Sequence, residues 1–396
     1  MKEIEIAQTY LKENEIDAWI LSDYENRNPA VVRFLGKRML TRKLFVVIPS
    51  REKPYIICHI IDTVFLRDEA ISSLFDLRVY KTWQEMLDLE KKSFSCYKKV
   101  CVDISENGLL PRVSLADYGT VSFIKNLVPE VVSSGNVLER ITATLSDRSK
   151  ALQRIANQKV LDIKDEAFSY IAKCVRKTGT ADEYDVQQFI CRRFKEEGLT
   201  YDEPPIVAIG PNASDPHYTP DEKTHSSIHE GDLILIDMWA MVDDPDGVYS
   251  DITWMGYVGT EIPEIYAKRF SILKNDVDLC VKFLEDNIGK RVIHGYEVDD
   301  VSRQYINEQG YGEYYTHRVG HSIAVDVSPH GSGANMDNYE THDDREILND
   351  LCFSLEPGIY APDFGMRSET NVLIDDGKPV VVAGRQETII PILLLK

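Results

Sequence analysis

Four acidic residues lie within runs of apolar residues that otherwise predict buried strands. Asp237 interrupts the run LILIDMWAM, and Asp251 lies in GVYSDITWMGYVG. Glu356 lies in LCFSLEPGIY and Glu369 in MRSETNVLI. A carboxylate that is buried without a partner either destabilises the fold or takes up a proton. A fold that buries four carboxylates must therefore supply positive charge beside them.

The four acids fall into two predicted hairpins. Residues 232–241 and 247–259 flank the turn formers VDDPD, and residues 351–360 and 366–374 flank APDFG. If each hairpin turns its two carboxylates to one face, they form an oxygen-rich cage that suits hard or borderline divalent metal ions. The alternative for any one acid is that it ends a strand or pairs with a lysine.

A nitrogen ligand for such a cage is available in THRVGHSIAVDVSPHG. His317 and His321 are four residues apart, as in the helix of the HExxH zinc proteases, but Arg318 stands where the glutamate is needed. Gly320 and the β-like run IAVDV also argue against a helix. We expect His321 to open a strand and to be the ligand, with His317 as its hydrogen-bonding partner.

One more histidine lies in a polar segment that contains two prolines, NASDPHYTP. His217, between Pro216 and Pro220, is predicted to lie on a rigid loop. On such a loop beside a metal site, a histidine is able to shuttle protons or orient a substrate. Taken alone, this histidine indicates little.

Composition excludes several classes of protein. The chain has 396 residues and a net charge of −20, so we expect no nucleic-acid partner, because such a surface repels phosphate backbones. No apolar run reaches the ~20 residues that span a bilayer, and the N-terminus has no signal-peptide core. The seven cysteines contain no CxxC pair, so we expect reduced thiols and a cytoplasmic protein.

The pattern changes near residue 147, which predicts two domains, 1–146 and 147–396. The first part alternates strands with helices and favours a small α/β domain. Its expected strands are 17–23, 43–49, 55–61 and 98–104, and its expected helices include 4–11 and 109–118.

The second part is predicted to be α+β, with long helices and antiparallel hairpins. Apolar residues at helical spacing predict a helix over 148–176, which Gly179 stops. Thr180 is expected to cap the next helix, with Glu183 completing a capping box. Further helices are expected over 263–288 and 298–308.

These features together resemble the pita-bread metallopeptidase family, whose metal ligands are Asp, Asp, His, Glu and Glu in that order. The matching residues are Asp237, Asp251, His321, Glu356 and Glu369. The resemblance covers roughly residues 150–396. More loosely, DAWILSDYENRNPAVVRFLG resembles the creatinase-type N-terminal domain. The resemblance implies an α+β pita-bread C-terminal domain with a smaller α/β creatinase-like N-terminal domain, in the prolidase and Xaa-Pro aminopeptidase branch.

The resemblance also implies a cofactor and a mechanism. Two divalent metal ions per chain are expected, with manganese first and cobalt, iron or zinc as alternatives. Asp251 and Glu369 would bridge the two ions, and a metal-bridging hydroxide would attack the carbonyl of an Xaa-Pro bond. Glu356 would be both a ligand and the catalytic acid/base.

Three further roles are implied only by the resemblance. His217 would assist the tetrahedral intermediate or the leaving nitrogen, and His317 would contact the substrate. Arg367 would help to bind the substrate, or would neutralise the acidic cage instead. The two-domain resemblance also predicts a homodimer in which the N-terminal domain narrows the partner's active site.

The chain departs from the family pattern at three places. Ser328 stands where the family has a second pocket histidine, with His330 two positions later, and Trp254 replaces an arginine. The two aspartates, Asp237 and Asp251, are also further apart than is usual. The substrate therefore stays open between a small Xaa-Pro peptide and another small molecule with a non-peptide amide or C–N bond. A non-catalytic binding module and a metal-free creatinase-like enzyme are the remaining alternatives.

Overall fold

The structure is a computed structural model that describes residues 2–395. The chain divides into two units, Met1–Ile141 and Thr142–Lys396, each with its own apolar core. The boundary that the sequence predicts, between residues 146 and 147, lies slightly further along the chain.

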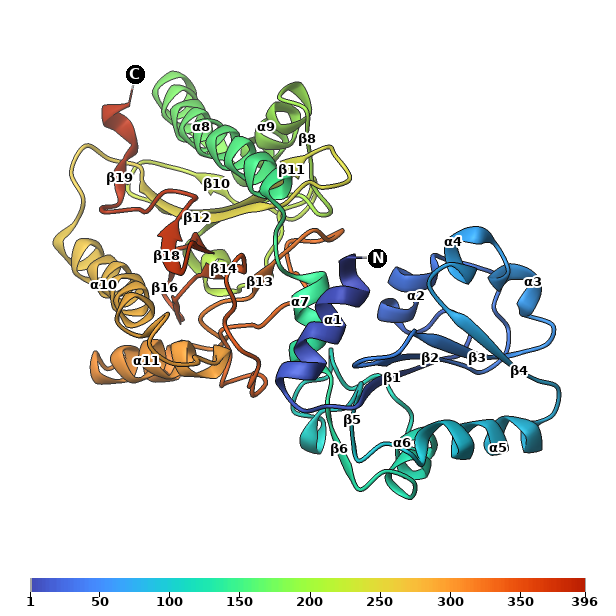
Figure 1. Cartoon of the computed structure of the whole chain (residues 1–396). Helices are drawn as coiled ribbons and strands as arrows, with labels where there is room; N and C mark the ends of the chain where they lie inside the picture. Colours follow the sequence, from blue (N-terminus) through green and yellow to red (C-terminus); the bar gives the residue numbers. More distant parts are fainter. Residues whose placement is uncertain (1, 396) are drawn as a thin grey trace. The chain divides into compact units, whose positions relative to one another are not determined.

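A six-stranded sheet forms the N-terminal unit, in the order β4-β3-β2-β1-β5-β6 (Figure 1). Its strands are β1 (Ala18–Asp23), β2 (Leu44–Pro49), β3 (Tyr55–His59), β4 (Asp76–Tyr80), β5 (Lys99–Val102) and β6 (Glu130–Ser133). Strand β2 is antiparallel to β1 and β3, and the other pairs are parallel. The four strands expected from the sequence are confirmed.

Helices cover both faces of this sheet. They are α1 (Lys2–Glu13), α2 (Pro29–Leu35), α3 (Thr63–Leu66), α4 (Glu69–Ser72), α5 (Trp83–Phe94), α6 (Tyr118–Lys125) and α7 (Gly135–Thr142). Trp19 and Leu21 of β1 belong to one buried cluster, and Ala18 and Ile20 belong to another. This alternation is the signature of a strand that is buried on both faces.

The prediction of a helix over 109–118 is wrong. Residues 109–116 form turns, in which Leu110 and Val113 are buried while Leu115 is exposed. Asp117 accepts a hydrogen bond from the Thr120 amide and so caps α6, which begins at Tyr118. The apolar residues of this segment reach the core from turns, and their spacing imitates a helical stripe.

Four long helices shape the C-terminal unit. They are α8 (Asp147–Thr178), α9 (Glu183–Glu196), α10 (Glu264–Asn287) and α11 (Gly295–Glu308). Ser146 caps α8, and Gly179 ends it in the left-handed conformation with φ of 84°. Figure 1 shows α8 and α9 on one side of the strands of this unit, and α10 and α11 on the other.

The prediction of a capping box formed by Thr180 and Glu183 is wrong. Residues Ala181–Asp182 form the short strand β7, which pairs with β10 (Ser227–Ile228). Strand pairing therefore takes the place of the cap, and Asp182 precedes α9 without a side-chain capping bond. Glu183 instead turns inward and is fully buried.

Two sheets lie between the helix layers of the C-terminal unit. The first joins β8 (Leu199–Thr200), β11 (Leu233–Val242), β12 (Ser250–Tyr257) and β19 (Ile390–Pro391), with β9 (Ile206–Ile209) also paired to β11. The second joins β13 (Ser322–Ile323), β14 (Cys352–Leu355), β17 (Thr370–Asp375) and β18 (Lys378–Val381). A separate hairpin pairs β15 (Gly358–Ala361) with β16 (Phe364–Arg367).

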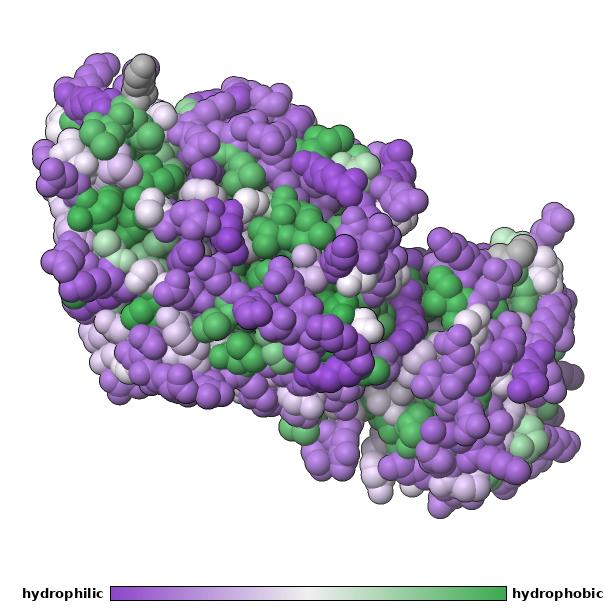
Figure 2. Space-filling view, turned by 60° about the vertical axis from the view of Figure 1, so that its left-hand side comes forward, coloured by the Kyte–Doolittle hydropathy of each residue, from purple (hydrophilic) through white to green (hydrophobic). Residues whose placement is uncertain are grey.

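The surface and helix lengths add one observation about environment. On the face drawn in Figure 2, hydrophilic residues predominate and apolar residues form separate patches. Among residues 2–395, none of the helices is both long enough and apolar enough to cross a bilayer.

Glu90, on α5, provides a test of the N-terminal core. It is buried, and one of its carboxylate oxygens has no hydrogen-bond partner within the described residues. Burial raises the pKa of Glu90 to about 7, whereas the unfolded chain ionises near its ordinary value. The unfolded state thus binds fewer protons between pH ~4.5 and ~7, so the free energy of unfolding falls as pH rises through this window.

We expect Glu90→Gln to remove this fall and to stabilise the protein at pH 8 by on the order of 2 kcal/mol. Urea denaturation of the variant and the wild type at pH 5 and pH 8 measures the effect. Asp88→Asn, at an exposed position on the same helix, is the matched control. Identical pH dependence in wild type and Glu90→Gln would contradict the expectation.

Candidate metal centre

The first hairpin places its two aspartates on one face. In the antiparallel pairing of β11 with β12, Asp237 lies opposite Thr253 and Asp251 lies opposite Trp239. The aspartates are therefore diagonal neighbours on the same face, and both are buried. Ile236 and Ile252, each directly next to one of the aspartates in sequence, point to the other face, where they pack with α8 and α9.

The second hairpin places its two glutamates in a gap between two paired regions. Leu355 of β14 lies opposite Thr370 of β17, and pairing resumes with Gly358 opposite Arg367, so Glu356 and Glu369 lie at the unpaired break. Glu356 donates its amide to the carbonyl of Val319 at 2.7 Å, which ties it to the histidine segment. Freed from sheet pairing with each other, both glutamates turn into the space between the sheets.

Specific hydrogen bonds dock the two hairpins against each other. The amide of Glu369 donates to the Thr253 carbonyl at 3.2 Å, and the Thr253 hydroxyl donates to Oε2 of Glu369 at 2.7 Å. The Asn371 side chain joins the Asp251 amide and carbonyl at 3.0 and 2.7 Å. These bonds fix the distance between carboxylates that repel one another.

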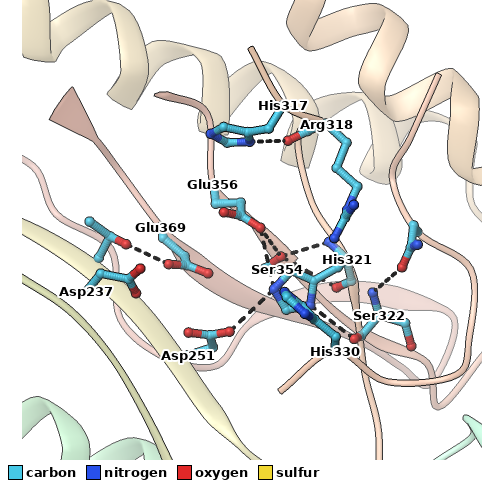
Figure 3. A network of polar contacts seen from close by, with 12 residues as sticks. Asp237, Asp251, His317, Arg318, His321, Ser322, His330, Ser354, Glu356 and Glu369 are labelled. Carbon is cyan, nitrogen blue, oxygen red and sulfur yellow. Dashed lines mark hydrogen bonds and ion pairs between the residues drawn. The ribbon is translucent and has the colours of Figure 1, made fainter. Parts of the chain in front are cut away.

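His321 projects into the same space. Its Nε2 lies 3.4 Å from Oδ2 of Asp251 and 3.4 Å from Oε1 of Glu356 (Figure 3). Its Nδ1 faces the Ser322 carbonyl at 3.2 Å, and its amide donates to the Ser354 hydroxyl. Burial alone would lower the pKa of His321, but the two neighbouring carboxylates raise it.

Asp251, His321 and Glu369 form a group that is able to hold a metal ion. Each offers one ligand atom, and these atoms lie within 4.8 Å of one another. Asp237 and Glu356 flank the group in Figure 3. Carboxylate oxygens with one imidazole nitrogen are a donor set that divalent transition metals accept.

The electrostatics of the acids are those of a site that is able to bind a cation. Burial raises the pKa of Asp237 to about 7, although Arg367 opposes this shift. Burial and the neighbouring carboxylates also raise the pKa of Asp251 and Glu369. Glu356 differs: burial raises its pKa, but His321, His317 and Arg367 together lower it. A divalent cation would relieve the repulsion that, together with burial, raises the pKa of the other three acids.

Arg367 lies inside the acidic cluster and is almost fully buried. Its Nη2 forms an ion pair with Asp237, its Nε donates to the Thr253 hydroxyl at 2.9 Å, and its Nη1 donates to the Tyr360 hydroxyl at 2.8 Å. All three donor groups are thus engaged by the protein. This geometry favours neutralisation of the cage over substrate binding, the two roles left open by the sequence.

A cavity of about 490 Å³ opens onto the cluster. Its walls include all five candidate ligands, together with His217, His317, Arg367, Trp239, Asp202, Arg318, His330 and Glu340. His217 is exposed on the wall, and its amide donates to Asp215 at 3.0 Å. The sequence-based candidates therefore all reach one cavity.

The expected contact between His317 and His321 is wrong. Nε2 of His317 faces the Tyr360 hydroxyl at 2.8 Å, and its Nδ1 faces the Arg318 carbonyl at 2.7 Å. Burial lowers the pKa of His317 despite the charge of Glu356 nearby. His317 lines the cavity, and its lowered pKa favours the neutral form of the ring.

Tyr360 was missed by sequence reasoning, although a signal existed. It lies four residues after Glu356 in an extended segment, and residues at even spacing in a strand share a face. Trp239 lies two residues after Asp237 in β11 and therefore on the same face of that strand. Its Nε1 donates to Asp202 at 2.7 Å. By contrast, no sequence signal indicates the ion pair of Arg318 with Glu340 on the cavity wall.

Trp254 and Ser328, the two residues that differ from the family pattern, lie in different surroundings. Trp254 packs against the Lys164 ammonium on the α8 side of the sheet, so this departure from the family pattern lies away from the cavity. His330 lies beside the site, with its ring centroid 4.2 Å from that of His321. The hydroxyl of Ser328 accepts a hydrogen bond from the His330 amide at 3.2 Å.

Comparison with known proteins agrees with this geometry. An Xaa-Pro dipeptidase of Lactobacillus delbrueckii subsp. lactis is 32% identical over 190 residues, which cover 47% of each chain. The alignment thus spans about half the length of that relative. The fold resembles those of dipeptidase PepE from Mycobacterium ulcerans (19% identity, TM-score 0.67) and a prolidase from Pyrococcus horikoshii (21%, 0.55). These likenesses cover 98% of this chain and 96% and 100% of the two neighbours.

The neighbours share the pita-bread fold, so the expected fold class is confirmed. The model of metallopeptidase family M24 matches residues 156–376, which is more than half of the chain and includes every candidate ligand. This protein therefore belongs to metallopeptidase family M24.

Proposed function

We propose that this protein is a metal-dependent hydrolase that cleaves Xaa-Pro bonds in small peptides, as a dipeptidase or an aminopeptidase. The observation that carries the proposal is the convergence of four acids, three buried and Glu356 partly buried, and His321 on one cavity. The Xaa-Pro dipeptidases among its relatives supply the substrate class. A cavity of about 490 Å³ is of a size that suits a short peptide.

The proposed ligands are Asp237, Asp251, His321, Glu356 and Glu369, which together would hold two divalent metal ions. Manganese is the expected metal, and cobalt, iron or zinc fit the same donors. Divalent ions held there would supply Lewis acidity toward the scissile carbonyl and toward water. Asp251 and Glu369 are the proposed bridging ligands.

Glu356 and His217 are assigned the proton transfer and the hydrogen bonding to the reacting atoms. The Glu356 carboxylate, whose pKa is held low, is the proposed base that accepts a proton from the attacking water. It then returns this proton to the leaving nitrogen. His217, which also lines the cavity, donates a hydrogen bond to the developing oxyanion or to the leaving nitrogen.

His317 binds and orients the substrate, and Tyr360 holds His317 in place. Their mutual hydrogen bond, together with that from Arg367 to the Tyr360 hydroxyl, fixes both side chains against the cavity. Arg367 holds Asp237 in place and offsets one negative charge. We assign substrate contact to His317 and a supporting role to Arg367.

One observation favours a second candidate substrate. His330 lies against His321, while Ser328 lies beyond the residues that line the cavity. This wall therefore differs from the pattern expected for the family's peptidases. Hydrolysis of a non-peptide amide or other C–N bond at the same metal site is the alternative. A purely binding role gives no reason to gather four acids around one cavity.

We also propose that the N-terminal unit is the creatinase-like domain of a cytoplasmic homodimer, with the domains 1–146 and 147–396. Sedimentation at micromolar concentration tests the oligomeric state. A monomer would contradict the proposed dimer.

Removal of divalent metal should destabilise the wild type but not Glu369→Gln. In wild type, metal at about 100 times its Kd adds roughly 2.7 kcal/mol of stability, which raises the Tm by several degrees. Glu369→Gln removes a carboxyl group whose ionisation is opposed by burial and by the neighbouring acids, so the metal-free variant should melt above the metal-free wild type. Scanning calorimetry with manganese and with a chelator measures both effects. Equal metal-induced shifts in the two proteins would contradict the ligand assignment.

Manganese-loaded protein should hydrolyse Ala-Pro and Leu-Pro and leave Ala-Ala intact. Release of proline, followed by chromatography, measures the activity. Asp251→Asn should lower the rate by at least about 100-fold, because the site loses a bridging ligand. Cleavage of Ala-Pro-Ala distinguishes an aminopeptidase from a dipeptidase. Turnover of none of these peptides by protein that binds metal would favour the non-peptide substrate.

A further inference from the structure

Glu183, the first residue of α9, is a fully buried carboxylate that the proposed mechanism does not use. Its Oε1 accepts the Ile209 amide at 2.8 Å, and its Oε2 accepts the Tyr218 hydroxyl at 2.6 Å and the Ser226 amide at 2.7 Å. The Asn212 side chain donates to both oxygens at 3.2 and 3.1 Å. These donors satisfy a buried charge that, among the described residues, has no ion-pair partner.

All four partners of Glu183 belong to one segment, residues 209–226, which carries His217. Ile209 and Ser226 lie at its two ends, and Tyr218 directly follows His217. Within the segment, Asp215 accepts the amide of His217 at 3.0 Å, and its carbonyl accepts the amide of Tyr218 at 3.0 Å. The backbone beside His217 is therefore tied to Glu183 by a short chain of hydrogen bonds.

The opposite side of the same segment rests on the hairpin β15–β16. The Ser214 hydroxyl donates to the Ala361 carbonyl at 2.6 Å. A side chain at Gly365 would meet the Ala213 carbonyl, since its Cβ would lie only 1.6 Å from that oxygen. This hairpin also carries Tyr360 and Arg367, so the His217 segment is held between Glu183 and a wall of the candidate site.

We infer that Glu183 is a positioning residue that fixes His217 at the cavity. The inference rests on the proposed function, in which His217 acts on the reacting amide. Glu183 itself is absent from the cavity walls and is not one of the candidate metal ligands. A glutamine has the same shape, but its NH₂ group cannot accept these donors, so it would release part of the segment.

A double-mutant cycle with His217→Ala tests the inference. We expect His217→Ala to lower kcat by about 100-fold and Glu183→Gln by about 10-fold or more. If Glu183 acts through His217, adding Glu183→Gln to His217→Ala should lower kcat by less than ~2-fold. Multiplication of the two losses would overturn the inference, because a merely structural role would act independently of His217.

Three comparisons complete the experiment. Glu196→Gln, an exposed position on the same helix that pairs with Arg193, should leave kcat unchanged. Tyr218→Phe removes one donor to Glu183 and should reproduce part of the Glu183→Gln loss, in case that variant folds poorly. The metal content of Glu183→Gln should equal that of wild type. A loss of bound metal would mean that Glu183 supports the ligands and would overturn the inference.

Hydrogen exchange of the full-length protein gives a readout that does not depend on activity. Glu183→Gln should increase exchange across residues 209–226 by at least ~3-fold, with α10 and α11 unchanged. Unchanged exchange in this segment would overturn the inference even if the enzyme is active. Increased exchange in a protein without Xaa-Pro hydrolase activity would leave the positioning role standing and count against the proposed function alone.

Discussion

Repulsion among buried carboxylates is the constraint on which the C-terminal unit depends. Asp237, Asp251, Glu356 and Glu369 all reach one cavity, and burial alone raises the pKa of each. Arg367 and the histidines offset only part of this charge. The negative charge that they leave uncompensated explains why the site is suited to divalent cations, which would lower the pKa of these acids.

The rest of the fold holds these charges at fixed positions. Asn371 and Thr253 join the two hairpins by bonds that involve backbone as well as side chains. Helices α8 and α9 cover one sheet, and apolar residues of α10 and α11 pack on the strand faces that bear the acids. The proposed role of Glu183 extends the same logic, since a buried charge there organises the segment that carries His217.

Charged residues are rare within apolar strands, so the sequence singles out Asp237 and Asp251 as candidate ligands. The pairing of β11 with β12 brings both to one face, as the prediction of a shared hairpin face requires. Local capping signals were less reliable. Thr180 looked like a helix cap, but the pairing of β7 with β10 took its place, and residues 109–118 imitate a helix with buried turn residues. The partner of His317 depends on how separate segments meet, so no local pattern could have identified Tyr360 as that partner.

Divalent cations are proposed to compensate the charge of these acids. The most direct test is to strip the protein of metal, dialyse it against manganese at neutral pH, and measure bound metal per chain by inductively coupled plasma mass spectrometry. The account predicts about two ions per chain, together with release of protons into the buffer on binding. Protein that binds no manganese, cobalt, iron or zinc while keeping its full stability would contradict it.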